Sequence, residues 1–235
     1  MHRLILIGML VLGAACQDST GPSLDTEAAA GPFGTNGNGP GASSSSDDDE
    51  ECVGTRTGTF ENVIVPSGAT CTLQSATVKG NVKALENARL FVNASHVHGN
   101  VQGDEASVVQ VTGGTVDGDI QIEEGDSPSE LGAAVTGGTV VTAGNIQIAK
   151  MNTSRVLVSD ARVLKGNIQI TENNASTSLE ILGNYVAQNL QVFKNRGGNK
   201  VVSGNTVGQA IQCKENTSPF NGGPNTAGET EGQCF

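Results

Sequence analysis

The sequence predicts an all-β fold, a single-stranded, right-handed parallel β-helix of about seven coils. The first observation is a motif, best preserved as Gly-Asn-Ile-Gln-Ile at residues 144–148 and 166–170, which recurs in seven copies at steps of 19 to 26 residues. The second is the alternation of aliphatic and polar residues within each copy, which is the period of a β-strand. A repeat of about twenty residues is typical of a solenoid, in which each coil stacks on the one before it.

The alternation predicts the direction of each side chain. Ile120 and Ile122 fall on one side of their strand and the intervening Gln121 on the other. Stacked coils place like residues in columns, so aliphatic columns should lie inside and an amide column outside. The predicted outer column comprises Gln102, Gln121, Gln147, Gln169, Gln191 and Gln212. Its amides can bond to one another or to a sugar, which makes it a candidate binding surface.

Two further sets of apolar residues complete a three-sided coil. One set lies three positions before each Asn of the motif and comprises Val78, Val97, Val116, Thr142, Leu164, Val186 and Val207. The other consists of pairs such as Leu90 with Val92. Three short inward strands per coil favour a β-helix over a propeller blade or a leucine-rich repeat.

The Asn position of the motif is predicted to be structural. Its members are Asn81, Asn100, Asp119, Asn145, Asn167 and Asn189. Stacked Asn side chains form hydrogen-bonded ladders, and Asn beside Gly tolerates the left-handed backbone of a tight corner. A row that binds a ligand is the alternative.

The N-terminal residues have the features of a lipoprotein signal. An apolar stretch at residues 4–12 leads through small residues to Cys16. Small residues directly before a cysteine resemble the bacterial lipobox, which implies a signal peptide at residues 1–15, lipidation of Cys16 and export to a membrane of the bacterial cell envelope. An ordinary signal peptide cleaved near Ala15 is the alternative.

Residues 16–51 are rich in Gly, Ser, Pro and Asp, and we expect them to form a disordered tether that carries the lipidated cysteine. A flexible coil of this length has a root-mean-square reach of about 30 to 35 Å. The folded body is therefore predicted at residues 52–235.

The other four cysteines suit disulfides in an exported protein. We expect the pairs Cys52–Cys71 and Cys213–Cys234, because each pair flanks one end of the repeat region. A zinc site is the alternative, although the spacing lacks a Cys-x-x-Cys pair. Disulfide-closed ends predict a monomeric body, since uncovered ends of a β-helix invite stacking.

The formal net charge is −11. Phosphate binding requires clustered Lys and Arg, so nucleic acid is excluded as a partner. The expected partners are instead the membrane, through the lipid anchor, and a glycan or a protein.

The longest step of the repeat contains an acidic insertion, and we consider it as a cation site. Carboxylate oxygens bind calcium, the one cofactor considered for this chain. The candidate residues are Asp117, Asp119, Glu123, Glu124, Asp126 and Glu130. No calcium-loop motif accompanies them, so a solvated acidic loop is the alternative.

His96 and His98 share a strand side and can hold a metal, although an exposed pair in a column with Thr77, Thr115 and Thr206 is the simpler interpretation.

Catalysis is not predicted. Exported β-helices include pectate lyases, but such sites need a base or paired carboxylates, and sugar grooves offer aromatic surfaces. This chain has no Trp and one Tyr. A divergent polysaccharide lyase or hydrolase stays an alternative.

The repeats, together with Cys52-Val53-Gly54-Thr55 and Gly232-Gln233-Cys234, resemble a group of uncharacterised bacterial exported proteins. The resemblance covers residues 52–235 and implies a β-helix without implying an activity. A weaker resemblance to bactofilins implies the alternative of a self-assembling structural protein. The leading hypothesis is a lipid-anchored, non-catalytic β-helix that is displayed at the envelope and binds glycan, matrix or protein.

Overall fold

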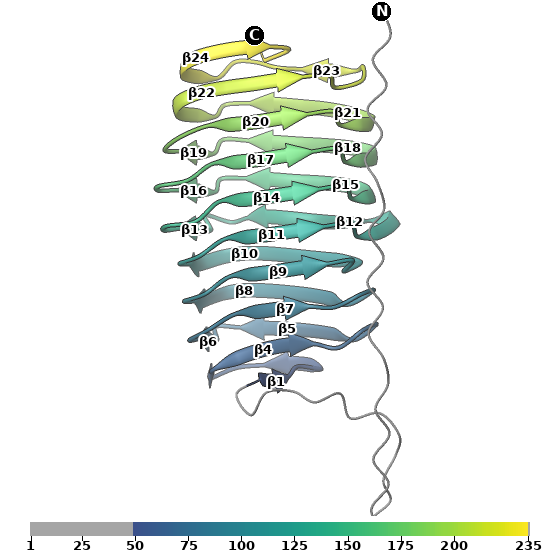
Figure 1. Cartoon of the computed structure of the whole chain (residues 1–235), viewed down its shortest axis with the longest axis vertical. Helices are drawn as coiled ribbons and strands as arrows, with labels where there is room; N and C mark the ends of the chain where they lie inside the picture. Colours follow the sequence, from purple (N-terminus) through teal and green to yellow (C-terminus); the bar gives the residue numbers. More distant parts are fainter. Residues whose placement is uncertain (1–48, 235) are drawn as a thin grey trace, which may run out of the picture. The chain divides into compact units, whose positions relative to one another are not determined.

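The computed structural model describes residues 49–234, which wind into a parallel β-solenoid of about nine turns without a helix (Figure 1). The predicted signal peptide, Cys16 and most of the predicted tether lie outside the described residues. In Figure 1 the chain rises as the front strands run to the right and the rear strands to the left, so the coil is right-handed, as expected. The count exceeds seven because the first and last coils lack the Gly-Asn motif.

The strands form three faces, and within each face neighbouring strands run parallel. Face 1 comprises β2 (Gly54–Arg56), β5 (Thr70–Gln74), β8 (Arg89–Val97), β10 (Val108–Val116), β12 (Asp126–Thr136), β15 (Asn152–Ser159), β18 (Asn174–Leu182), β21 (Arg196–Ser203) and β23 (Phe220–Asn221). Face 2 comprises β3 (Thr59–Phe60), β6 (Thr77–Val78), the ends of β8 and β10, β13 (Val140–Val141), β16 (Arg162–Val163), β19 (Tyr185–Val186), and the starts of β22 (Thr206–Lys214) and β24 (Thr226–Gly232).

Face 3 carries the repeat motif. It comprises β1 (Asp49–Glu51), β4 (Asn62–Val65), β7 (Val82–Ala84), β9 (Val101–Asp104), β11 (Ile120–Glu123), β14 (Ile146–Ala149), β17 (Ile168–Thr171), β20 (Leu190–Phe193) and the ends of β22 and β24. Because the register is in phase from coil to coil, Ile120, Ile146 and Ile168 stack directly and are fully buried. The predicted aliphatic interior is confirmed.

One interior column differs from the prediction in two coils. Val116 pairs with Val141, and Val141 with Val163, so Val141 and Val163 occupy the interior. Thr142 and Leu164 lie outside this column, and Leu164 is 39% exposed. These coils have one more residue between the inward valine and the motif Asn, so counting back three positions gives the wrong residue.

The Gly of the motif is required for packing. A Cβ on Gly144 would lie 2.3 Å from the carbonyl oxygen of Gly118 in the coil below, and one on Gly166 would lie 2.1 Å from that of Gly144.

The motif Asn residues do not have the left-handed backbone predicted for them. That conformation occurs instead after the face 3 strands, at Glu105, Glu124, Lys150, Glu172, Lys194 and Glu215, with φ between 54° and 58°.

Both predicted disulfides form. Cys52 and Cys71 have Cα atoms 5.5 Å apart, and those of Cys213 and Cys234 are 5.3 Å apart. The pairing excludes a zinc site made from the four thiols. Each bridge closes a terminal coil onto its neighbour, as the positions of the cysteines predicted.

The body begins before Cys52. Asp49–Glu51, assigned to the tether by their acidity, pair with β4 as strand β1. Backbone pairing explains the difference, because an edge strand of a solenoid can carry charged side chains exposed to solvent. The described residues include no helix able to cross a membrane.

Candidate functional site

The predicted glutamine ladder lies on the outside of face 3. Each Nε2 donates to the Oε1 of the glutamine one coil above, at 3.2, 3.2, 2.8, 2.9 and 3.1 Å from the lowest pair to the highest. The side chains are half-buried. Since an amide has two N–H donors and two acceptor lone pairs, each inner member of the ladder retains one of each. The ladder is therefore an ordered row of amides that can still bind a ligand.

A groove of about 370 Å³ opens at the lower end of this ladder. Its lining includes Lys83, Gln102, Asp104, Gln121 and Glu123. Lys83 takes the place of a glutamine in the coil below Gln102. The groove thus offers amides together with charges of both signs.

The acids predicted to form a cation site are dispersed. Asp119 belongs to the Asn ladder and accepts the N–H of Asn145 at 2.7 Å. Glu124 pairs with Lys150 at 2.5 Å, and Asp126 accepts a hydrogen bond from Asn152 at 2.8 Å. Glu123 lines the groove and Glu130 pairs with Arg89 at 2.5 Å. In residues 49–234 these acids do not form a group that could hold a calcium ion.

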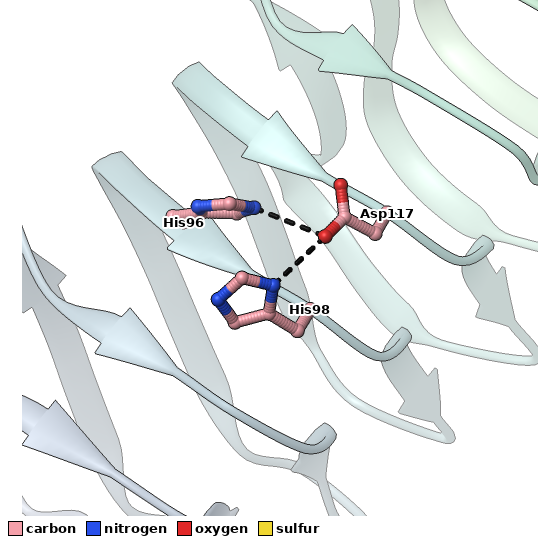
Figure 2. A group of neighbouring side chains, drawn as sticks. All are labelled: His96, His98 and Asp117. Atoms are coloured by element: carbon pink, nitrogen blue, oxygen red, sulfur yellow. Dashed lines mark hydrogen bonds and ion pairs between the residues drawn. The ribbon is translucent and has the colours of Figure 1, made fainter.

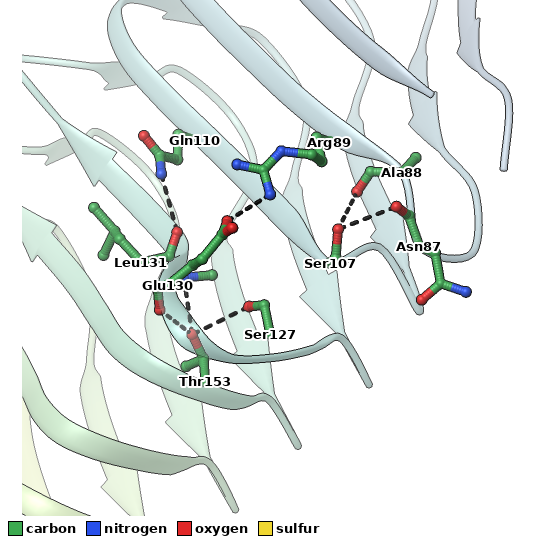
Figure 3. A network of polar contacts seen from close by, with 10 residues as sticks. Asn87, Ala88, Arg89, Ser107, Gln110, Ser127, Glu130, Leu131 and Thr153 are labelled. Carbon is green, nitrogen blue, oxygen red and sulfur yellow. Dashed lines mark hydrogen bonds and ion pairs between the residues drawn. The ribbon is translucent and has the colours of Figure 1, made fainter. Parts of the chain in front are cut away.

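The acidic insertion is part of strand β12 and is held against the adjacent coils (Figure 3). The ion pair of Glu130 with Arg89 ties it to β8. The amide of Gln110 donates to the carbonyl of Leu131 at 2.9 Å, and the Thr153 hydroxyl donates to the carbonyl of Glu130 at 2.7 Å. These contacts from three strands make the insertion an ordered bulge of face 1.

Charges alternate along the corner that follows face 3. Glu124, Lys150, Glu172, Lys194 and Glu215 each follow a strand of successive coils. The Lys150 ammonium donates a hydrogen bond to Glu124, which raises the pKa of that lysine. Lys194 lies 3.7 Å from Glu172. With Glu105 one coil below Glu124, the corner carries four glutamates and two lysines, so it stays acidic although both lysines are paired.

His96, His98 and Asp117 converge where face 2 turns into face 3 (Figure 2). Nε2 of His96 lies 3.1 Å, and Nδ1 of His98 2.9 Å, from the same oxygen, Oδ2 of Asp117. The Thr142 hydroxyl donates to Oδ1 at 3.0 Å. Burial alone would raise the pKa of Asp117, but the hydrogen bonds from Thr142 and both histidines hold it below its ordinary value.

The sequence contained the signal for this third residue. The repeat is 19 residues long at this point, so Asp117 occupies the position of His98 in the next coil. The pairing of Val97 with Val116 fixes that register. From the sequence alone, the histidine pair and Asp117 are candidates for two different sites. The column of Thr77, His96, Thr115 and Thr206 is confirmed on face 2, where Arg162 and Tyr185 also belong to it.

Comparison with protein-family models, curated proteins and solved structures finds no match to this chain. The ligands that suit the glutamine ladder and the cluster of His96, His98 and Asp117 therefore follow from the geometry of these residues.

Proposed function

We propose that the protein is an exported, lipid-anchored, non-catalytic rod whose glutamine face binds an extended polysaccharide. The ordered amide ladder carries this proposal. Sugar hydroxyls both donate and accept hydrogen bonds, and each inner glutamine of the ladder offers one free donor and one free acceptor. Strands about 4.8 Å apart repeat this pattern along the rod, which suits a long ligand of repeating units.

The apolar residues favour a polysaccharide over a protein partner. Protein interfaces depend on aromatic or aliphatic anchors that become buried. Among residues 49–234 the exposed large hydrophobic side chains are Val53, Leu164 and Tyr185, and none belongs to face 3. A polar face of this kind suits a hydrated ligand.

The two disulfides and the lipobox-like residues before Cys16 support the location. Disulfides persist in oxidising compartments outside the bacterial cytoplasm. The acidic composition between Cys16 and the first strand, rich in Gly, Ser and Pro, is suited to a spacer that lifts the rod from a membrane. Metabolic labelling with palmitate tests the anchor: the wild type should be labelled and Cys16→Ser should not, and an unlabelled wild type would contradict it.

Co-sedimentation of the full chain with insoluble polysaccharides tests the binding. The insoluble probes are peptidoglycan sacculi, cellulose and chitin. Alginate is the soluble probe, and its binding is measured as slower migration of the protein in native gels that contain it. We expect retention by at least one probe, and at least a tenfold loss in Gln147→Ala/Gln169→Ala, the order of magnitude expected for removing amide hydrogen bonds.

Thr206→Ala is the matched control, because it removes an outward polar side chain from face 2. It should bind as the wild type does. Retention by none of the probes, or equal retention by the double glutamine variant, would overturn the proposal.

A further inference from the structure

We propose that His96, His98 and Asp117 form a binding site for one first-row transition-metal ion, represented by Zn²⁺. The site lies at the corner between faces 2 and 3 (Figure 2). The inference is independent of polysaccharide binding, because it rests on other side chains.

The three ligand atoms lie close to the spacing that a metal requires. Both imidazole nitrogens face one carboxylate oxygen at 3.1 and 2.9 Å, and all three atoms lie within 4.8 Å of one another. Tetrahedral zinc with bonds of about 2.0 to 2.1 Å has ligand atoms separated by about 3.3 Å. Small side-chain movements would therefore admit an ion among them.

The backbone holds these residues in position. His96 and His98 flank the buried Val97, the last residue of strand β8, so both point outward. The backbone N–H of His98 donates to Val78 in the coil below, and that of Asp117 donates to Val97, both at 2.8 Å. Asp117 follows the next strand up the stack. The site thus spans two adjacent coils of a rigid solenoid.

A second interaction orients the carboxylate. Thr142, one coil above, donates its hydroxyl hydrogen to Oδ1 of Asp117 at 3.0 Å. The other oxygen, Oδ2, is thereby directed to the histidines. Outer hydrogen bonds of this kind orient metal ligands and tune their affinity, commonly by about 10- to 100-fold. We assign Thr142 as a positioning residue.

The donor set selects the class of metal. Imidazole suits zinc, copper and nickel, whereas calcium and magnesium prefer sites made wholly of oxygen. The side chains of His96, His98 and Asp117 are 42%, 44% and 34% exposed, so an ion can enter from solvent. Three protein ligands leave a fourth position for water or for a ligand group.

Zinc competition against a chromophoric chelator, with the full-length protein, tests the site. Wild type should bind one more equivalent of Zn²⁺ than His96→Gln/His98→Gln. His2, the remaining histidine, and Cys16 are present in both proteins, so any zinc that they bind cancels in the difference. Asp117→Asn and each single histidine variant should weaken binding by about 100-fold or more, and Thr142→Val by about tenfold.

Asp104→Asn is the matched control, because it removes an exposed carboxylate at the end of β9 without touching the site. X-ray absorption of the zinc-loaded wild type should show two imidazole ligands, and the double histidine variant should lack them. Far-UV circular dichroism of each variant checks that the solenoid is intact. Equal zinc stoichiometry in wild type and the double histidine variant, or a zinc shell without imidazole, would overturn the proposal.

Discussion

The side chain of Asn195 lies directly above Asn173, and its Oδ1 accepts both the backbone N–H and the Nδ2 of Asn173, at 3.1 and 3.0 Å. Asn173 in turn donates through Nδ2 to the carbonyl of Ile148 at 3.0 Å. Asn216 continues the ladder above Asn195. A similar ladder at another corner comprises Asn184, Asn205 and Asn225. Each buried amide satisfies corner backbone groups that would otherwise lack partners.

Replacing Asn195 by alanine should destabilise the solenoid strongly. The change leaves the N–H of Asn173 and the carbonyl of Ile170 without their partner inside the protein. Leaving buried polar groups unsatisfied costs about 1 to 3 kcal/mol each, so for two groups we expect a loss of about 2 to 6 kcal/mol in the free energy of unfolding. Urea denaturation measures it. Asn174→Ala, in an exposed ladder, is the control and should change stability by about 0.5 kcal/mol or less.

Gly144→Ala tests whether the motif glycine is required by packing. The added Cβ would lie 2.3 Å from the carbonyl oxygen of Gly118, so adjacent coils would have to separate. We expect a loss of about 2 to 4 kcal/mol, the range of overpacked cores and strained backbone. At Gly138 a Cβ meets no atom within 4 Å, although φ is +77°. Gly138→Ala should cost about 1 kcal/mol, and equal losses would contradict the packing explanation.

Lys200 should make stability depend on alkaline pH. Its side chain is fully buried in an interior column, between Leu179 and Phe220, and its ammonium donates to the carbonyl of Gly198 at 2.7 Å. Burial lowers the pKa of Lys200 from 10.5. Between the folded pKa and 10.5 the unfolded chain binds more protons, so stability rises with pH in that window.

The comparison is with Lys200→Met, which keeps the length of the side chain and cannot titrate. The free energy of unfolding of wild type minus that of the variant should increase from about pH 7 toward about pH 10. Urea denaturation at several pH values measures this difference. A difference that is constant or falls with pH would show that burial does not disfavour the charged lysine.

Repetition explains which parts of the structure were predictable. Ile120 and Gln121 were placed correctly because in-phase stacking converts a sequence period directly into columns. Thr142 was misplaced because one extra corner residue changes the local count without changing the repeat. The insertion forms part of a strand and not a solvated loop. The sequence repeat does not predict this, because no repeat step relates Glu130 to its partner Arg89. Asp117 was recoverable, because one repeat step links it to His98.

The two ends of the rod carry glutamates in matching columns, Glu51 exposed at the first end and Glu231 paired with Lys214 at the last. In the outer column of face 3, Glu51 lies in register with Ile64 below the glutamine ladder, and Glu231 lies in register with Gln212 above it. Glu50 is in register with the buried Val63, so a charge stands at the end of an aliphatic column. Head-to-tail stacking would bring Glu231 of one copy toward Glu51 of the next. Charges at strand edges oppose such association.

Glu50→Val/Glu51→Gln should therefore allow stacking. The first change completes the aliphatic column, and the second extends the glutamine ladder to the end of the rod. We expect light scattering and electron microscopy to show rods or short filaments for this variant and monomers for the wild type. Glu61→Gln removes a charge from the side of the rod, beside Lys79, and is the matched control, which should stay monomeric. A monomeric double variant would show that another feature, such as the disulfide-closed coils or the chain before Asp49, prevents assembly.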